Sequence, residues 1–190
     1  AAAPVAAIVF YRALLQAGNL APVDALIAAL QARGINPLPL YCNSLKDPQS
    51  AEVVRGLLTD SGCEIVLNAT GFALSAPGAA RAETPFDACN GPVLQVVFSG
   101  GTTAAWEEGT TGLSARDIAM NVALPEVDGR VLSRAVSFKG EARYDPATQT
   151  SVVAYEPRAD RIDFVAELAR RWVRLKRLPA AKRSIAVVLA

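Results

Sequence analysis

The feature that most constrains the fold is an alternation of short apolar runs with segments of helical periodicity. Two of the intervening segments, residues 22–33 and 48–60, repeat their apolar side chains at helical spacing. The runs have strand length, and the later ones are apolar on both faces, as buried parallel strands are. They are residues 5–11, 35–41, 64–69 and 93–99. This alternation predicts an α/β fold, a doubly wound and mainly parallel sheet with flanking helices.

Local signals refine the boundaries of these elements. Pro37 and Pro39 cannot donate ladder hydrogen bonds, which favours an edge position for the second strand. Asp47 and Pro48 have the order of an N-cap and a first helical residue. Residues 70–91 are rich in Gly, Ala and Pro, so we expect this stretch to hold only a short helix.

The pattern changes near residue 123. Ser114 begins a capping sequence for a helix that we expect to stop before Pro125. Residues 130–138 and 150–155 have strand character and flank a polar turn, so they predict a β-hairpin attached to the sheet.

The last part of the chain predicts a long amphipathic helix and a further strand. Asp160 stands at the expected N-cap, and Pro179 ends the helix. Residues 185–189 again resemble a buried parallel strand. The expected apolar stripe of the helix consists of Ile162, Val165, Ala169, Trp172 and Leu175.

We therefore expect three segments. Residues 1–123 form the α/β core, residues 124–157 form a motif turn and the hairpin, and residues 158–190 form a helix and a strand. Because the chain begins and ends on strands, we expect it to be a slice of something longer, with that last strand leading into the next domain.

Composition excludes several kinds of chemistry. No histidine occurs among the 190 residues, which rules out a Ser-His-Asp triad, a Cys-His pair and an HExxH zinc site within this chain. Cys42, Cys63 and Cys89 lack CxxC spacing, which favours buried reduced thiols over zinc or iron–sulfur ligation. No apolar run approaches the ~18 residues of a membrane span.

The basic C-terminal part does not predict a nucleic-acid interface. Residues 158–190 carry nine basic and three acidic side chains. The one aromatic residue among the cations between residues 170 and 183 is Trp172, which belongs to the expected apolar stripe, so a solvated helix face is favoured.

Small polar residues follow the strands, where open α/β sheets bind ligands. Asn68 and Thr70 follow the third strand, and Ser99, Gly100 and Gly101 follow the fourth. The Ser-Gly-Gly loop has the composition of an anion cradle but is no Walker loop, so a structural turn and a ligand contact both remain open.

Two carboxylates, Glu126 and Asp128, lie two residues apart between Pro125 and Gly129. Such a pair suits a divalent cation or a general base. From spacing alone, a surface turn whose Asp-Gly pair serves backbone geometry is the favoured interpretation.

Several long strings resemble a known family. NATGFA (68–73), QVVFSGG (95–101), GLSARDIAMNVALPEVDG (112–129) and SFKGE (137–141) are similar to the large subunit of aerobic cobaltochelatase and, more loosely, of magnesium chelatase. The resemblance covers essentially the whole chain. Because the family's large subunit is several times longer, the resemblance implies an internal fragment that is inactive alone.

The resemblance implies an activity and partners. The parent enzyme would insert Co(II), its substrate, into hydrogenobyrinic acid a,c-diamide during cobalamin synthesis in the cytoplasm. ATP with Mg²⁺ would be bound by two partner subunits, one an AAA+ ATPase, and not by this chain. The alternatives are a magnesium chelatase acting on protoporphyrin IX, or a non-catalytic α/β domain that binds a small molecule or docks a neighbour.

The resemblance also implies roles for particular residues. The family's LPE-x-DG motif falls on residues 124–129, which makes Glu126 the leading candidate for accepting pyrrole protons or binding the metal transiently, with Asp128 in support. Arg116, Arg130 and Arg134 would pair with acidic side chains of the corrinoid.

Overall fold

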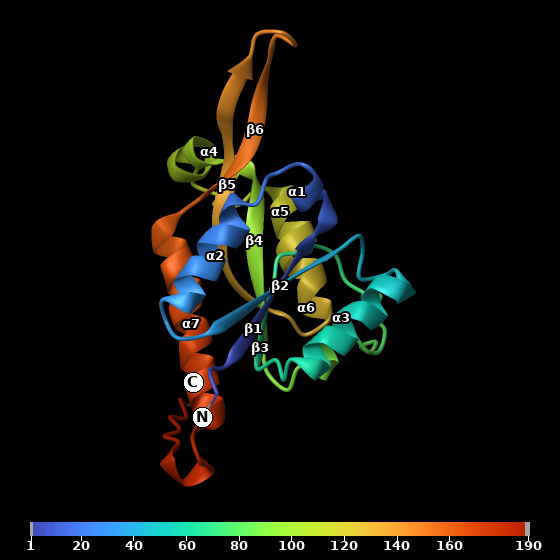
Figure 1. Ribbon diagram of the computed structural model, residues 1–190, viewed down its shortest axis with the longest axis vertical. Coiled ribbons are helices and arrows are strands. Elements are labelled where there is room, and N and C mark those ends of the chain that lie inside the picture. Colours follow the sequence, from blue (N-terminus) through green and yellow to red (C-terminus); the bar gives the residue numbers. More distant parts are fainter. Residues whose placement is uncertain (1, 189–190) are drawn as a thin grey trace.

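The computed structural model describes residues 2–188 and contains one six-stranded sheet (Figure 1). The strand order is β2-β1-β3-β4-β5-β6; the first five strands are parallel, and β6 pairs antiparallel with β5. The strands are β1 (Val5–Tyr11), β2 (Asn36–Cys42), β3 (Ile65–Asn68), β4 (Val93–Thr102), β5 (Val131–Asp145) and β6 (Thr150–Pro157). The parallel part has the order of a flavodoxin-like fold, whose direction of winding reverses between β1 and β3.

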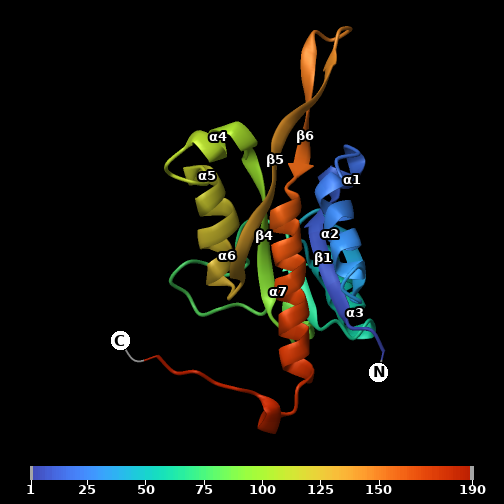
Figure 2. The same ribbon diagram turned by 90° about the vertical axis from the view of Figure 1, so that its left-hand side faces the viewer.

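Helices cover both faces of the sheet, which confirms the predicted doubly wound α/β class (Figures 1 and 2). The α-helices are α1 (Arg12–Gln16), α2 (Ala21–Gln31), α3 (Pro48–Asp60), α4 (Thr103–Glu108), α5 (Ala115–Ile118), α6 (Leu124–Val127) and α7 (Ala159–Arg177). Short 3₁₀ helices span Pro85–Ala88 and Ala180–Lys182, and one turn of π-helix, called the π-turn below, spans Ala119–Ala123. No helix in residues 2–188 is long and apolar enough to cross a membrane.

Alternate residues of each central strand supply two separate cores. Ile8 of β1 and Leu67 of β3 pack with Leu26 of α2 and Val165 of α7 on one face. On the other face, the neighbouring strand residues pack against α3 and the Pro85–Ala88 turn. This period-2 division explains why the central strands are apolar on both sides.

Several expected details are confirmed. β2 lies at the edge of the sheet, where its prolines are tolerated. The Asp47 carboxylate accepts a hydrogen bond from the Ser50 N–H at 3.0 Å, which caps α3. All three cysteines are buried free thiols, and the sulfur atoms of Cys63 and Cys89 are 3.4 Å apart.

The helix that begins at Ser114 does not stop before Pro125, contrary to our expectation. It continues through the π-turn into α6, and Pro125 lies in the first turn of α6. The wider π geometry accommodates a proline without an ordinary helical hydrogen bond at that point. The predicted irregular turn at 124–129 is therefore a helix end, with Gly129 in the left-handed region at φ 76°.

The start and stripe of the last helix also differ from expectation. Arg158, not Asp160, is the N-cap of α7, because the Arg158 N–H bonds the Val136 carbonyl at 2.8 Å and ties the helix start to β5. Ala166 and Val173 are buried on the sheet side, whereas Trp172 and Leu175 of the predicted stripe are partly exposed.

The predicted strand at 185–189 is wrong for residues 185–188, which form no strand; residue 189 lies outside the described residues. Ile185 is 86% and Val188 89% exposed, because this segment leaves the end of α7 away from any edge of the sheet (Figure 2). The hairpin of β5 and β6 is confirmed and projects beyond the body of the fold (Figure 1). We expected a boundary between the α/β core and the hairpin segment at residues 123 and 124. The sheet extends across that boundary, because β5, which follows it, pairs parallel with β4, which precedes it.

Candidate functional site

The reversal of winding between β1 and β3 opens a cleft at the carboxyl ends of these strands. A cavity of about 230 Å³ lies there, and its lining includes Tyr11 at the end of β1, Thr70 after β3, Lys46, Phe72 and Arg130. This is the position at which open α/β sheets bind ligands.

A second cavity of about 490 Å³ adjoins the first. Both are lined by Tyr11, Gly71 and Phe72. The second cavity adds two exposed cations, Arg116 and Lys139. Two cavities therefore share one wall, and each carries positive charge.

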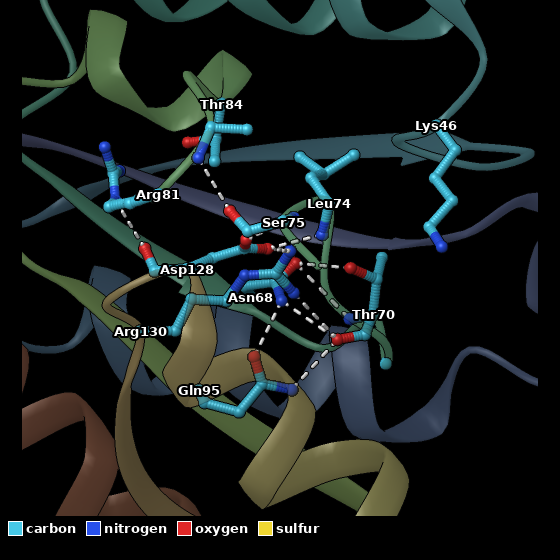
Figure 3. A network of polar contacts seen from close by, with 12 residues as sticks. Lys46, Asn68, Thr70, Leu74, Ser75, Arg81, Thr84, Gln95, Asp128 and Arg130 are labelled. Carbon is cyan, nitrogen blue, oxygen red and sulfur yellow. Dashed lines mark hydrogen bonds and ion pairs between the residues drawn. The ribbon is translucent and has the colours of Figure 1, made fainter. Parts of the chain in front are cut away.

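A buried amide network holds Thr70, which lines the first cavity (Figure 3). Asn68 donates to the Gln95 side-chain oxygen at 2.8 Å and to the Thr70 carbonyl at 3.0 Å. Gln95 donates to the same carbonyl at 2.9 Å, and the Thr70 hydroxyl donates to Asn68 at 2.9 Å. The side chains of Asn68 and Thr70, both predicted as site residues, thus shape the loop by bonding to each other.

Asp128 is buried beside this network and holds the neighbouring loop in place (Figure 3). Its carboxylate accepts the N–H groups of Leu74 at 2.8 Å and Ser75 at 2.9 Å, and pairs with Arg130 at 2.9 Å. Burial opposes ionisation, but these donors and the charge of Arg130 outweigh it, so the pKa of Asp128 lies below the ordinary carboxyl value. Asp128 is therefore an ionised positioning group.

Arg130 is buried in the wall of the first cavity. Besides pairing with Asp128, its guanidinium approaches the Thr70 carbonyl at 3.5 Å, and its Nε–H has no hydrogen-bond partner among the described residues. Burial lowers the pKa of Arg130, and the charge of Asp128 opposes that shift. Its donors are thus only partly used by this chain.

The Ser99-Gly100-Gly101 loop is occupied by a side chain of the protein. Asp117 accepts the Ser99 hydroxyl at 2.7 Å and the Gly100 N–H at 3.2 Å. The Gly101 N–H bonds the Ser99 hydroxyl at 3.1 Å. These bonds favour the structural-turn interpretation of the loop, although Gly100 and Gly101 line the second cavity.

Glu126 and Asp128 lie in different surroundings. Glu126 is exposed on α6, and its carboxylate makes no hydrogen bond or ion pair within residues 2–188. It lines neither of the two cavities. In the part of the chain that the structure describes, no group of three or more His, Cys, Asp or Glu side chains is arranged to hold a metal ion.

The three predicted arginines also differ in whether they line a cavity. Arg130 lines the first cavity and Arg116 the second. Arg134 lines neither cavity; its guanidinium lies 3.5 Å from the ring centre of Phe164 on α7. Sequence reasoning missed Tyr11, Lys46, Phe72 and Lys139 as lining residues; only the position of Tyr11 at a strand end offered a signal.

The fold and the cleft define a doubly wound α/β domain with cavities lined by cationic side chains at its topological switch point. The aerobic cobaltochelatase subunit CobN of a Sinorhizobium species is 49% identical over 187 residues, 98% of this chain and 15% of that protein. The same-named subunit of Pseudomonas aeruginosa is 44% identical over equal shares. The chloroplastic magnesium-chelatase subunit ChlH of Oryza sativa subsp. japonica is 29% identical over 197 residues, 98% of this chain and 13% of that protein.

A solved structure has the same fold. The catalytic subunit of cobaltochelatase from Mycobacterium tuberculosis matches with a TM-score of 0.74 and 32% identity, covering 95% of this chain and 15% of that chain. The model of the CobN/Magnesium Chelatase family matches residues 1–190. The chain belongs to this family, as the resemblance predicted, and spans about 15% of the length of its cobaltochelatase relatives.

Proposed function

We propose that this chain contributes to the corrinoid-binding subunit of an ATP-dependent cobaltochelatase in the cytoplasm, which inserts Co(II) into hydrogenobyrinic acid a,c-diamide for cobalamin synthesis. The observation that carries the proposal is the 49% identity to a cobaltochelatase subunit over almost the whole chain, against 29% for the magnesium-chelatase relative. Such an enzyme is a ligase that forms nitrogen–metal bonds.

The cations of the cleft suit the carboxylates of a corrinoid. Arg116 and Lys139 are exposed at the second cavity, and Lys46 and Arg130 line the first. A guanidinium binds a carboxylate through parallel N–H bonds, and a partly enclosed site strengthens this attraction. The acidic side chains of the substrate would therefore be held on both sides of the Tyr11–Phe72 wall.

Glu126 is the proposed acid–base group. Insertion requires inner N–H protons of the macrocycle to leave as the nitrogens bind the metal, and it requires water to leave the hydrated ion. A carboxylate can accept such a proton or replace a water as a transient Co(II) ligand. Glu126 is exposed and its carboxylate is unbonded among the described residues, so it is free for this role. Because it lines neither cavity, the role requires the macrocycle to extend beyond them. Asp128 instead fixes the loop and Arg130.

The ATP requirement is assigned to partners. Two other subunits, one an AAA+ ATPase, would bind ATP with Mg²⁺, and the absence of a Walker sequence from these 190 residues agrees with this division.

The test is Glu126→Gln in the protein as it occurs naturally, assayed with its partner subunits, ATP, Co(II) and hydrogenobyrinic acid a,c-diamide. We expect metal insertion to be abolished while corrinoid binding stays within about twofold, because the amide is isosteric but is not a base. The matched control is Glu108→Gln, an exposed carboxylate on α4.

Normal turnover by the Glu126 variant would contradict its role. Insertion of Mg²⁺ into protoporphyrin IX, in place of cobalt insertion, would favour the magnesium-chelatase alternative.

A further inference from the structure

Phe72 has a backbone conformation that phenylalanine rarely adopts. Its φ is 64°, in the left-handed region, where a bulky side chain is strained. The other described non-glycine residue with positive φ is Gln149, in the tip of the hairpin. The Phe72 ring is also 46% exposed, so burial of the ring does not offset the strain.

The surrounding chain fixes this conformation from two sides. The Tyr11 hydroxyl accepts the Gly71 N–H at 3.1 Å and donates to the Gly71 carbonyl at 3.2 Å. The Phe72 N–H bonds the Met120 carbonyl in the π-turn at 2.8 Å. A Cβ on Gly71 would lie 3.0 Å from that carbonyl, so the close approach favours glycine there. β1 and the π-turn together determine where the ring of Phe72 lies.

The Phe72 ring belongs to the wall of three cavities. It lines the 230 Å³ cavity, the 490 Å³ cavity and a third of about 320 Å³. Lys46 lies at the first and third cavities. Arg116 and Lys139 lie at the second. An exposed aromatic face is therefore placed between two groups of cations.

We propose that Phe72 is a ligand-binding residue, whose ring stacks against a flat conjugated ligand that carries carboxylates. The conjugated ring of the ligand lies on Phe72, and its carboxylates reach Lys46 on one side and Arg116 and Lys139 on the other. Offset contact between π systems favours this arrangement, and the cations match the anionic groups. The inference rests on the proposed function, since a carboxylated tetrapyrrole is such a ligand.

The strained backbone has a use in this arrangement. The bonds from Tyr11 and Met120 hold the loop in this strained conformation, and a loop that is already fixed loses less entropy when a ligand binds. A phenylalanine kept only for packing would have no reason to remain half exposed in a strained conformation.

The test measures tetrapyrrole affinity in the protein as it occurs naturally, with hydrogenobyrinic acid a,c-diamide and protoporphyrin IX as probes, by quenching of tryptophan fluorescence. Phe72→Leu removes the π face and keeps apolar bulk, and we expect its affinity to fall roughly tenfold. Phe72→Tyr keeps the face and is expected to bind within about twofold. The matched control is Tyr144→Leu, an exposed aromatic on the projecting hairpin.

Phe72→Gly separates binding from folding. Glycine accepts the left-handed conformation without strain, so the midpoint of thermal unfolding should stay equal or rise while affinity falls as in Phe72→Leu. A lower midpoint with unchanged affinity would assign Phe72 a purely structural role and overturn the inference.

The remaining outcomes distinguish the two proposals. If the wild type binds a tetrapyrrole and Phe72→Leu binds it with equal affinity, the role of Phe72 is overturned and the proposed function stands. Failure of the wild type to bind either tetrapyrrole would overturn the proposed function and this inference with it.

Discussion

Replacing Asp128 by Asn should destabilise the 190-residue chain by about 4 kcal/mol. The side chains of Asp128 and Arg130 are 0% and 2% exposed and 2.9 Å apart, so the neutral amide leaves a guanidinium buried without its counter-charge. Breaking a buried pair in this way costs about 3–5 kcal/mol. The two carboxylate oxygens of Asp128 accept the N–H groups of Leu74 and Ser75, and the amide of Asn keeps only one such oxygen. One N–H group is then left without its acceptor, which costs about 1–3 kcal/mol; this cost is partly included in the cost of breaking the ion pair.

The assay is urea unfolding followed by circular dichroism, with thermal unfolding as a second measure. A loss of about 4 kcal/mol corresponds to a fall of roughly 10 °C in the unfolding midpoint for a chain of this length. Adding Arg130→Met should restore roughly 1–3 kcal/mol, because it removes the unpaired charge. The control is Asp163→Asn, which breaks an exposed ion pair with Arg33 and should change stability by less than about 1 kcal/mol. A loss below about 1 kcal/mol in the Asp128 variant, or no recovery in the double variant, would refute this account of the loop.

Three further measurements test the Asp128 carboxylate at different pH, the cap of α3 and the loop at Gly71. The lowered pKa of Asp128 means that its contribution to stability is present above about pH 5 and is lost as the pH falls through the folded pKa, so Asp128→Asn should flatten the acid side of a stability–pH profile; parallel profiles would contradict this. Asp47→Ala should cost about 1 kcal/mol in urea unfolding through loss of the α3 cap, and an unchanged midpoint would show that the cap contributes nothing. Tyr11→Phe should cost about 1–2 kcal/mol and speed hydrogen exchange at the Gly71 amide, whereas unchanged exchange would mean that the hydroxyl does not fix that loop.

The sequence predicted the sheet well, because its elements carry local signals. Continuous apolar strands and the Asp47-Pro48 cap depend on neighbouring residues, and the structure has them where they were expected. One local signal failed, since the apolar run at 185–188 forms no strand. The other exceptions depended on distant contacts. The π-turn carries the helix past Pro125, and a bond from Arg158 to the Val136 carbonyl sets the start of α7.

The site was less predictable. Thr70, which follows a strand end, lines the first cavity, whereas Asn68 lines neither, and the sequence could not reveal that these side chains bond each other. Likewise, the resemblance implied that Glu126 and Asp128 act together, whereas the helix end exposes one and buries the other. The left-handed backbone of Phe72 depends on Tyr11 and Met120, which are far from it in sequence.

We infer that the cleft at the carboxyl ends of β1 and β3 holds the tetrapyrrole. The most direct measurement is an experimental structure of the natural protein with hydrogenobyrinic acid a,c-diamide bound. We expect the conjugated ring of the substrate to contact Phe72 and its carboxylates to lie within hydrogen-bond distance of Arg116 or Lys139. A bound corrinoid that touches no residue of this cleft would contradict it.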